Sequence, residues 1–319
     1  MPSEFELIAR HFTRPVRHTV LGVGDDAAIV RPASGMDLVV TTDMLVAGTH
    51  FLPDAEPEAL GWKALAVNLS DLAAMGAQPR WTVVAAALPE ADEAWIAAFA
   101  RGFFACAESF DVDVIGGDTT RGPLNIAPTV FGEVPQGQAL TRAGGRAGDE
   151  LWVSGTPGLA ALGLNHRLGK VSLPDTATER CLAALDRPQP RIALGLALRC
   201  LATAAIDVSD GLLADIGHIL ERSALAADIE FDCLPRAVFE TGVDAALAQQ
   251  CLVAGGDDYE LAFAAPPERR GNIEALAARL RLPLTRIGRL RAGPTAELVL
   301  RDTAGRPMPA ARRGFDHFA

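Results

Sequence analysis

The sequence predicts an α/β (α+β) fold in two domains, and three observations predict it. Stretches with strand character alternate with stretches of helical spacing through both halves of the chain. Residues 141–149 are rich in glycine and lack large apolar side chains, as is typical of a domain boundary. The chain has 319 residues, and a single hydrophobic core usually stops growing near ~250–300. We therefore expect domains at 1–143 and 149–319.

The first half is expected to start its main sheet at residues 37–43, a strand that runs into a polar turn. Residues 58–75 carry apolar side chains at helical spacing, and Gly76 and Pro79 mark the end of that helix. The remaining elements expected in this half are strand 81–88, a helix at about 92–109, strand 112–115 and strand 126–134.

The second half restarts the pattern after the glycine-rich boundary. Strand 150–154 and helix 158–168 come first, and a proline-rich passage follows at 187–190. The elements expected after it are helix 191–202, strand 204–208, helix 211–223, strand 228–233, a further helix, strand 259–264, helix 269–280 and two final strands.

Composition narrows the function classes. The formal net charge is −11, and no basic run extends beyond Arg312-Arg313, so neither nucleic acid nor an anionic membrane is an expected partner. No apolar run approaches the ~18 residues of a membrane helix. The N-terminus is acidic and lacks the pattern of a secretory signal. The five cysteines are scattered without a C-x-x-C pair and are expected to be reduced thiols. We expect a cytoplasmic protein.

Aspartates recur beside glycine or a hydroxyl residue at the expected ends of apolar strands. Asp71 differs, because it lies inside a helix that otherwise looks buried. The five strand-end groups are Gly24-Asp25-Asp26, Thr41-Thr42-Asp43, Gly116-Gly117-Asp118-Thr119-Thr120, Ile206-Asp207-Val208-Ser209-Asp210-Gly211 and Gly255-Gly256-Asp257-Asp258.

Each group has two interpretations. Asp next to Gly is an ordinary turn pair, and Ser70 or Asp210 has the residue type of a helix N-cap. Asp71 fits that interpretation worst, because a carboxylate in an apolar helix is costly without a partner. Taken together, carboxylates and hydroxyls suit Mg²⁺, which takes oxygen ligands and bridges carboxylates to phosphates. An acidic pocket would repel ATP unless divalent cations lay between them.

Familiar ATP-binding signatures are absent from the sequence. No G-x-x-x-x-G-K-[ST] motif is present, and neither H-R-D nor D-F-G occurs. The segment 207–211 lacks the D-x-D-x-T order of haloacid-dehalogenase phosphatases. If the protein uses ATP, it therefore uses a different fold.

Seven motifs in fixed order resemble those of the thiamine-monophosphate kinases, a family of the aminoimidazole-ribonucleotide-synthetase superfamily. The resemblance spans nearly the whole chain. The motifs are Gly-Val-Gly-Asp-Asp-Ala-Ala (22–28), Thr-Thr-Asp-Met-Leu-Val-Ala-Gly-Thr-His-Phe (41–51), Asn-Leu-Ser-Asp-Leu-Ala-Ala-Met-Gly-Ala (68–77), Ile-Gly-Gly-Asp-Thr-Thr-Arg-Gly (115–122), Ile-Asp-Val-Ser-Asp-Gly-Leu (206–212), Gly-Gly-Asp-Asp-Tyr-Glu-Leu (255–261) and Gly-Phe-Asp-His-Phe (314–318).

The resemblance implies an aminoimidazole-ribonucleotide-synthetase-like fold. Its N-terminal sheet would pair across a homodimer, its C-terminal domain would be α+β, and ATP would be held between the domains. The implied reaction transfers the γ-phosphoryl group of ATP to thiamine monophosphate with the help of several Mg²⁺ ions. Phosphoryl transfer of this kind requires positioning and charge neutralisation, so no covalent nucleophile is expected.

The resemblance also assigns roles to individual residues of this chain. Those implied to contact ATP are Gly117, Asp118, Arg142 and Ser209. Those implied to contact the thiamine substrate are His50, Asp257 and Phe315. Those implied to bind Mg²⁺ are Asp26, Thr41, Thr42, Asp43, Asp71, Asp118, Asp207 and Asp210. One position departs from the family pattern, because Asp257 stands where a Glu is expected and its side chain is one methylene shorter.

Relatives and other classes remain as alternatives. A selenophosphate synthetase would carry a reactive Cys and Lys near its N-terminus, whereas here the first are Cys106 and Lys63. A hydrogenase-maturation relative would end in cysteine, and this chain ends His-Phe-Ala. Aminoimidazole-ribonucleotide synthetase is the nearest enzyme alternative. A non-catalytic metal or nucleotide binder is the alternative from a different class.

Overall fold

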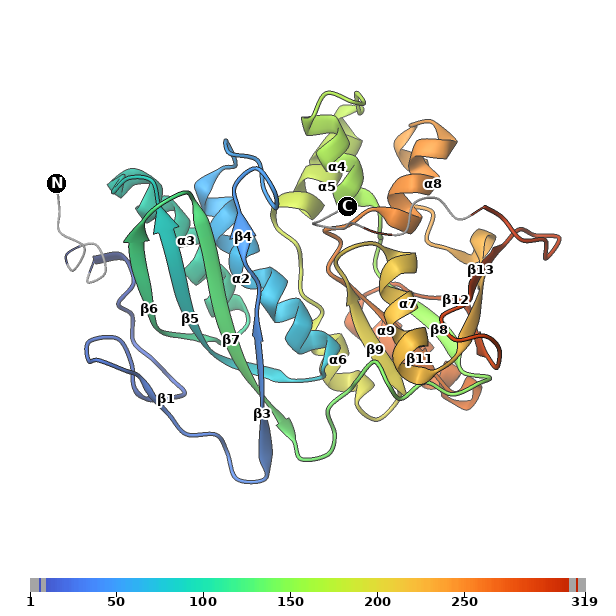
Figure 1. Ribbon diagram of the computed structural model, residues 1–319, viewed down its shortest axis with the longest axis horizontal. Helices are drawn as coiled ribbons and strands as arrows, with labels where there is room; N and C mark the ends of the chain where they lie inside the picture. Colours follow the sequence, from blue (N-terminus) through green and yellow to red (C-terminus); the bar gives the residue numbers. More distant parts are fainter. Residues whose placement is uncertain (1–5, 7–9, 310–313, 315–319) are drawn as a thin grey trace. The chain divides into compact units, whose positions relative to one another are not determined.

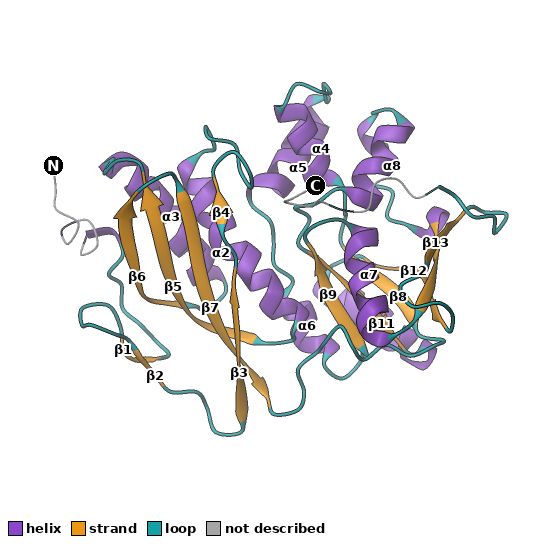
Figure 2. Cartoon of the chain, in the orientation of Figure 1, coloured by secondary structure: helices purple, strands orange, loops and turns teal. Residues whose placement is uncertain are grey.

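The structure is a computed structural model that describes residues 6, 10–309 and 314. The chain forms two compact units, coloured by sequence in Figure 1. The first comprises Met1–Leu72 and Ala77–Gln138, and the second comprises Ala73–Gly76 and Ala139–Ala319. Both contain strands and helices, as Figure 2 shows, which confirms the predicted mixed α/β class.

The first unit is built on a sheet with the strand order β3-β7-β5-β6. β5 and β6 are parallel and are joined by helix α3 (Glu93–Ser109), while the other neighbours in this order are antiparallel. The bounds are β3 Met36–Thr42, β5 Gln78–Leu88, β6 Asp113–Arg121 and β7 Asn125–Pro135; β4 Leu45–Val46 pairs with β7, and β1 Thr19–Leu21 pairs with β2 Ile29–Val30.

Two helices, α2 Pro57–Ala74 and α3 Glu93–Ser109, lie against one face of this sheet (Figure 1). The Asp92 side chain caps α3 by accepting the N–H groups of Ala94 and Trp95. The helices cross closely at Gly61 and Gly102, where a β-carbon would overlap the backbone of the other helix. Helix α2 is therefore buried, and its polar side chains need hydrogen-bond partners inside the unit.

The second unit is built on a six-stranded sheet with the order β13-β10-β12-β8-β11-β9. α7 packs against β9 and β11, and α9 packs against β12. The strands are β8 Glu150–Ser154, β9 Ala204–Val208, β10 Ala226–Glu230, β11 Glu260–Ala265, β12 Leu284–Arg291 and β13 Leu298–Arg301. The helices are α4 Leu159–Arg167, α5 Asp175–Asp186, α6 Ile192–Leu198, α7 Leu212–Ser223, α8 Ala245–Ala254 and α9 Arg270–Leu280.

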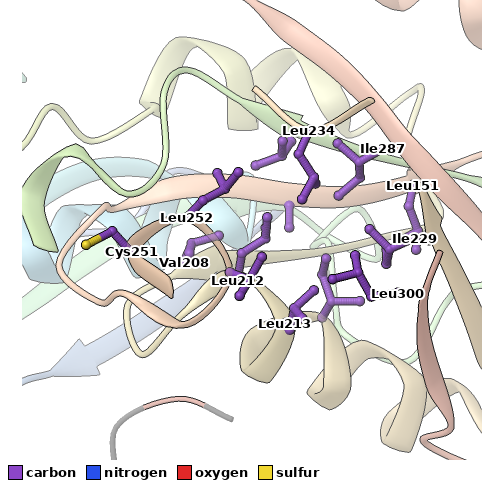
Figure 3. Packing of buried hydrophobic residues seen from close by; sticks show 14 of the residues in the cluster. Leu151, Val208, Leu212, Leu213, Ile229, Leu234, Cys251, Leu252, Ile287 and Leu300 are labelled. Atoms are coloured by element: carbon purple, nitrogen blue, oxygen red, sulfur yellow. The ribbon is translucent and has the colours of Figure 1, made fainter. Parts of the chain in front are cut away.

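The core of the second unit lies between this sheet and its helices. Figure 3 shows side chains from β8, β9, α7 and α8 packed together, among them Leu151, Val208, Leu212 and Leu252. Every residue of β8, β9 and β11 is buried. Strands buried on both faces are mostly apolar along their whole length, which is why these segments lack strand alternation.

A buried carboxylate forms an ion pair at the start of β11. Glu260 accepts hydrogen bonds from Arg191 Nε at 2.6 Å and Nη2 at 2.5 Å, and from Ser154 Oγ at 2.5 Å. Gly155 has a φ of +62°, and a β-carbon there would overlap the Glu260 carboxylate. The glycine is therefore required both by the backbone angle and by the ion pair.

The structure corrects three of the expected boundaries and adds one helix. β6 continues to Arg121 instead of ending at 115, because it pairs with β5 along that whole length. α5 is an additional helix that the sequence did not predict. α6 ends at Leu198, before the expected 202. β10 occupies 226–230 instead of 228–233, because Ala226 and Ala227 pair with β12.

The structure also bears on the expectations about membrane helices and cysteines. Across the residues that the structure describes, no helix combines the length and apolarity needed to cross a membrane. All five cysteines are free thiols. Burial raises the pKa of the Cys251 thiol to about 11, so it is protonated at neutral pH.

Candidate active site

The end of β3 and the middle of α2 form the first acidic cluster. The Thr41 hydroxyl donates to Asp71 Oδ2 at 2.5 Å, and the Asp43 N–H donates to Asn68 Oδ1 at 2.8 Å. Asn68 and Asp71 are three residues apart, so they lie on the same face of the helix. The structure therefore brings Thr41, Asp43 and Asp71 together.

The Thr42 hydroxyl makes different contacts. Successive side chains of a strand point to opposite faces of the sheet. The Thr42 hydroxyl donates to the Pro128 carbonyl at 2.9 Å and accepts from Thr129 Oγ1 at 3.2 Å, both on the neighbouring β7. Its hydroxyl is thus engaged away from the Thr41–Asp71 pair.

Asp118 is exposed and lies within β6, which corrects the expectation that it follows a strand end. β6 is three strand spacings from β3 in the sheet order, or about 14 Å. Gly117 precedes it, and a β-carbon there would overlap the Val84 carbonyl of β5. Close pairing with β5 is therefore one reason for this glycine. Asp118 lies on the same sheet as Thr41 without joining its cluster.

Two other predicted residues of this unit lie in connecting segments, Asp26 between two strands and His50 between β4 and α2. Asp26 is exposed between β1 and β2, where its N–H donates to Asp25 Oδ1 at 2.8 Å. His50 lies just after β4, and its Nδ1 accepts the Val46 N–H at 3.0 Å. A neutral His50 therefore carries its proton on Nε2. This bond fixes the orientation of the ring.

The second acidic cluster lies where β9 passes into α7. Asp207 is buried on β9, and Ser209 and Asp210 follow in the turn before the helix. We call residues 209–211 the nucleotide loop, after the role expected for Ser209. Gly211 begins the helix with a φ of +138°, which only glycine adopts readily, and it has no side chain to cap the helix.

A carboxylate from inside α7 satisfies this turn. Asp215 Oδ2 accepts the N–H groups of Ser209 at 3.0 Å, Asp210 at 3.1 Å and Gly211 at 3.1 Å. Burial raises the pKa of Asp215 to about 6, while the three donated hydrogen bonds oppose that shift. Asp215 is therefore mostly ionised at neutral pH and acts as an acceptor.

The loop before β11 carries Asp257 beside the nucleotide loop. The Asp257 N–H donates to the Ser209 carbonyl at 2.9 Å, and the Tyr259 N–H donates to the Val208 carbonyl at 2.8 Å. The Tyr259 hydroxyl donates to Asp257 Oδ1 at 3.1 Å. We call residues 255–259 the substrate loop, after the role expected for Asp257.

Two residues of the substrate loop have left-handed backbone angles, with φ of +67° at Asp257 and +50° at Tyr259. Each such residue costs about 1–3 kcal/mol and persists only where its surroundings hold it. Asp adopts this conformation more often than most other non-glycine residues. The backbone therefore suits Asp257, which stands where the family pattern has Glu.

Asp258 joins the substrate loop to helix α4. Its two carboxylate oxygens accept the Gly158 N–H at 2.9 and 2.8 Å, just before the helix begins. The residue keeps some exposed surface, but protein atoms enclose its carboxylate. Burial raises the pKa of Asp258 well above its ordinary value, while the Gly158 hydrogen bond opposes the shift.

Arg142 lies outside these clusters. Arg142 is exposed in the second unit, and its carbonyl accepts the Ser223 hydroxyl at 2.9 Å. Phe315, expected to contact the thiamine substrate, lies outside the described residues.

The carboxylate and hydroxyl oxygens of the two clusters are ligand types that Mg²⁺ binds. In the described part of the chain, no three His, Cys, Asp or Glu side chains gather closely enough to hold a metal by themselves. Mg²⁺ is commonly bound through one or two carboxylates, with water and substrate phosphates completing its coordination. The carboxylates and hydroxyl of the Thr41–Asp43–Asp71 cluster, and the carboxylates of Asp207 and Asp210, match that mode.

Sequence reasoning missed three residues that shape these clusters: Asn68, Asp215 and Asp258. A signal exists for two of them. Asn68 precedes Asp71 by three positions, which is one helical turn, and Asp215 follows Leu212 by three positions on the apolar face of its helix. A polar residue on a buried helical face needs a partner and therefore marks a structured contact. Asp258 looked like an ordinary turn residue.

Comparison with known proteins bears on the whole chain. The model of AIR synthase related protein, N-terminal domain, matches residues 24–134, and that of the C-terminal domain matches residues 146–301. The thiamine-monophosphate kinase of Salmonella typhimurium is 44% identical over 323 residues, covering 99% of this chain and 98% of that protein.

Solved structures agree with these matches. The crystal structure of thiamine-monophosphate kinase from Stenotrophomonas maltophilia K279a has a TM-score of 0.85 and 46% identity, covering 95% of this chain and 96% of that one. The structure of AaThiL complexed with AMPPCP and TMP has a TM-score of 0.77 and 30% identity, covering 98% and 96%. Identity at this level across nearly the full length shows that the chain belongs to the thiamine-monophosphate kinase family.

Proposed function

We propose that this protein phosphorylates thiamine monophosphate with ATP, giving thiamine diphosphate and ADP. The observation that carries the proposal is the 44% identity to a thiamine-monophosphate kinase over 99% of the chain. The relative complexed with AMPPCP and TMP supports the same pair of ligands. An oxygen of the acceptor phosphate forms a bond to the γ-phosphorus, the bond to the β,γ-bridging oxygen breaks, and its electron pair stays on ADP.

The chain's own contribution is to position two anions in line. The acceptor phosphate is already ionised, so it attacks without a strong general base or a covalent nucleophile on the protein. The Asn68 contact fixes the backbone of Asp43, and the Thr41 contact orients the Asp71 carboxylate. Orientation of this kind lowers the barrier, because the reacting groups no longer have to find each other.

The acidic residues of both clusters would hold Mg²⁺, which neutralises the phosphates when bound. The contact of Thr41 with Asp71 supports this assignment, as does the position of Asp207 on β9 just before the loop of Asp210. The full set proposed as ligands is Asp26, Thr41, Thr42, Asp43, Asp71, Asp118, Asp207 and Asp210.

The remaining roles follow the family resemblance. Gly117, Asp118, Arg142 and Ser209 would contact ATP, and His50, Asp257 and Phe315 would contact the thiamine substrate. The hydrogen bond from the Asp257 N–H to the Ser209 carbonyl supports neighbouring sites for the two ligands.

We also propose a homodimer formed through the first unit. β3 is an edge strand, and its exposed residues include large apolar ones. An exposed apolar edge commonly marks a protein interface. The large apolar side chains exposed in this unit are Val20, Leu21, Ile29, Leu38, Val40 and Met44.

We further propose functional domains at 1–143 and 149–319. We also propose a cytoplasmic location, and the free thiols at all five cysteines support this location.

Isotope transfer from γ-labelled ATP tests the reaction. With Mg²⁺ and thiamine monophosphate, we expect the label in thiamine diphosphate; with formylglycinamidine ribonucleotide, we expect no ring-closed product. Product only from the second substrate would favour aminoimidazole-ribonucleotide synthetase. No product from either, with ATP still bound, would favour a non-catalytic binder.

A further inference from the structure

Asp215 lies where a carboxylate is unusual. It is 3% exposed and shares the buried side of α7 with Leu212, Ile216 and Ile219. Figure 3 shows Leu212 and Leu213, near the start of the same helix, pointing into the apolar core. A carboxylate so placed is costly unless hydrogen bonds satisfy it.

Asp215 satisfies three consecutive backbone donors with one oxygen. The N–H groups of Ser209, Asp210 and Gly211 all donate to Oδ2 at 3.0–3.1 Å. Consecutive N–H groups at a helix start form a concavity that usually receives an external anion such as phosphate. Here the protein's own carboxylate occupies that concavity. A nucleotide phosphate would therefore meet the Ser209 hydroxyl instead of these amides.

The nucleotide loop in turn holds the substrate loop. The Ser209 carbonyl accepts the Asp257 N–H, and the Val208 carbonyl accepts the Tyr259 N–H. The loops also touch without side chains between them, because a β-carbon on Gly256 would lie 2.6 Å from the Ser209 carbonyl oxygen. The left-handed angles at Asp257 and Tyr259 need such a support. Movement of the nucleotide loop would therefore move Asp257.

We infer that Asp215 is a positioning residue that fixes the nucleotide loop and, through the Ser209 carbonyl, the placement of Asp257 in the substrate loop. The inference rests on the proposed function for its kinetic consequence. Its structural half, that Asp215 orders both loops, is independent of the substrate.

Three variants of the full chain separate positioning from general stability. Asp215→Ala removes the acceptor, and Asp215→Asn keeps an accepting oxygen without the charge. Ile219→Ala is the matched control, because Ile219 is fully buried one turn further along α7 and is not among the loop's hydrogen-bond partners. All are compared at a temperature where denaturation curves show each one folded.

Kinetics with Mg²⁺, ATP and thiamine monophosphate give the first measurement. We expect Asp215→Ala to lower kcat/KM for both substrates by about 10- to 100-fold, as loss of a residue supporting a ligand usually does. Asp215→Asn should lose less, and Ile219→Ala should stay near wild type. Equal losses in Asp215→Ala and Ile219→Ala would overturn the inference.

Amide hydrogen exchange gives a second measurement that needs no activity. We expect exchange at residues 209–211 and 257 to be about 10-fold faster in Asp215→Ala and unchanged in Ile219→Ala. If wild type fails to phosphorylate thiamine monophosphate, the proposed function fails while this measurement still decides the role of Asp215. If Asp215→Ala does not fold, the test uses Asp215→Asn. Amide exchange and kinetics equal to those of wild type in that variant would overturn the inference.

Discussion

The contact at the centre of the first unit's acidic cluster joins two regular elements, whereas most candidate ligands of the second unit lie on loops. Thr41 and Asp71 belong to a strand and a helix and contact each other through their side chains. Ser209, Asp210 and Asp257 lie on two loops whose backbone is fixed by hydrogen bonds. We therefore expect activity to depend mainly on the ligands themselves in the first unit, and also on the residues that support the loops in the second.

Removing a ligand charge in the first unit should have the largest effect. Asp71→Asn keeps an oxygen to accept the Thr41 hydroxyl but loses the charge that a cation requires. We expect kcat at saturating Mg²⁺ and ATP to fall by about 100- to 1,000-fold, the usual loss when one group that stabilises transition-state charge is removed. Asp43→Asn and Asp118→Asn should also lower turnover severely.

Ser70→Ala is the control for that prediction. Ser70 is fully buried next to Asp71, and its hydroxyl has no hydrogen-bond partner among the described residues. Its removal should leave turnover near wild type. Wild-type turnover in all three aspartate variants would refute the metal assignment and, with it, the contrast between the units.

A change beside the Arg191–Glu260 ion pair of the second unit should have an intermediate effect. Gly155→Ala places a methyl group against the Glu260 carboxylate and strains a positive φ. We expect the free energy of unfolding of the second unit to fall by about 3 kcal/mol, because the buried Glu260 carboxylate is moved from its partner Arg191. Denaturant titration followed by tryptophan fluorescence would measure this.

Gly271→Ala is the matched control in the same unit. Gly271 lies in α9, and a β-carbon there meets nothing within 4 Å. It should raise stability slightly, by about 0.5–1 kcal/mol, because alanine favours helix. Equal stability in the two variants would show that the surroundings of Glu260 accommodate the added methyl group.

The pH dependence of stability should show the smallest effect. Burial raises the pKa of Asp258 in the folded protein, so the protonated form is favoured there. Its contribution to stability is therefore present below the ordinary Asp pKa of about 4 and is lost as pH rises through the folded-state pKa. The Asp258→Asn variant has no charge to gain at this position, so its stability does not fall in this way as pH rises.

We therefore expect the stability of Asp258→Asn to rise relative to wild type as pH increases from 4. The gain should be about 1.4 kcal/mol per pH unit between the two pKa values. Urea unfolding at a series of pH values measures it. Parallel stability profiles for the two proteins would mean that burial does not raise the pKa of Asp258 in the folded protein.

Prediction from sequence succeeded where periodicity was strong. The helix expected at 58–75 and the strand at 150–154 correspond to α2 and β8, because their apolar residues follow the helical or fully buried pattern. Helix α5 was missed, because only a few of its residues are buried and the nearby prolines suggested a loop. β6 was cut short at Gly116-Gly117, although Gly117 serves close pairing with β5 instead of a turn.

Prediction of the site was less complete. The contact between Thr41 and Asp71 crosses thirty positions of sequence, and no local pattern encodes it. The role of Asp215 depends on three N–H groups that the loop turns toward one oxygen. Side-chain type identifies candidate ligands, but the backbone geometry that orients them arises only from packing.

The position of β11 in the sheet has a consequence for synthesis of the protein. β11 lies between β8 and β9, yet residues 260–265 are made about a hundred positions after β8. While the ribosome is still translating the segment before Glu260, β8 and β9 cannot be bridged, and β8 lacks both of its neighbours, β11 and β12. Nascent or prematurely truncated chains therefore expose an apolar strand edge that invites aggregation, and completing translation removes the hazard.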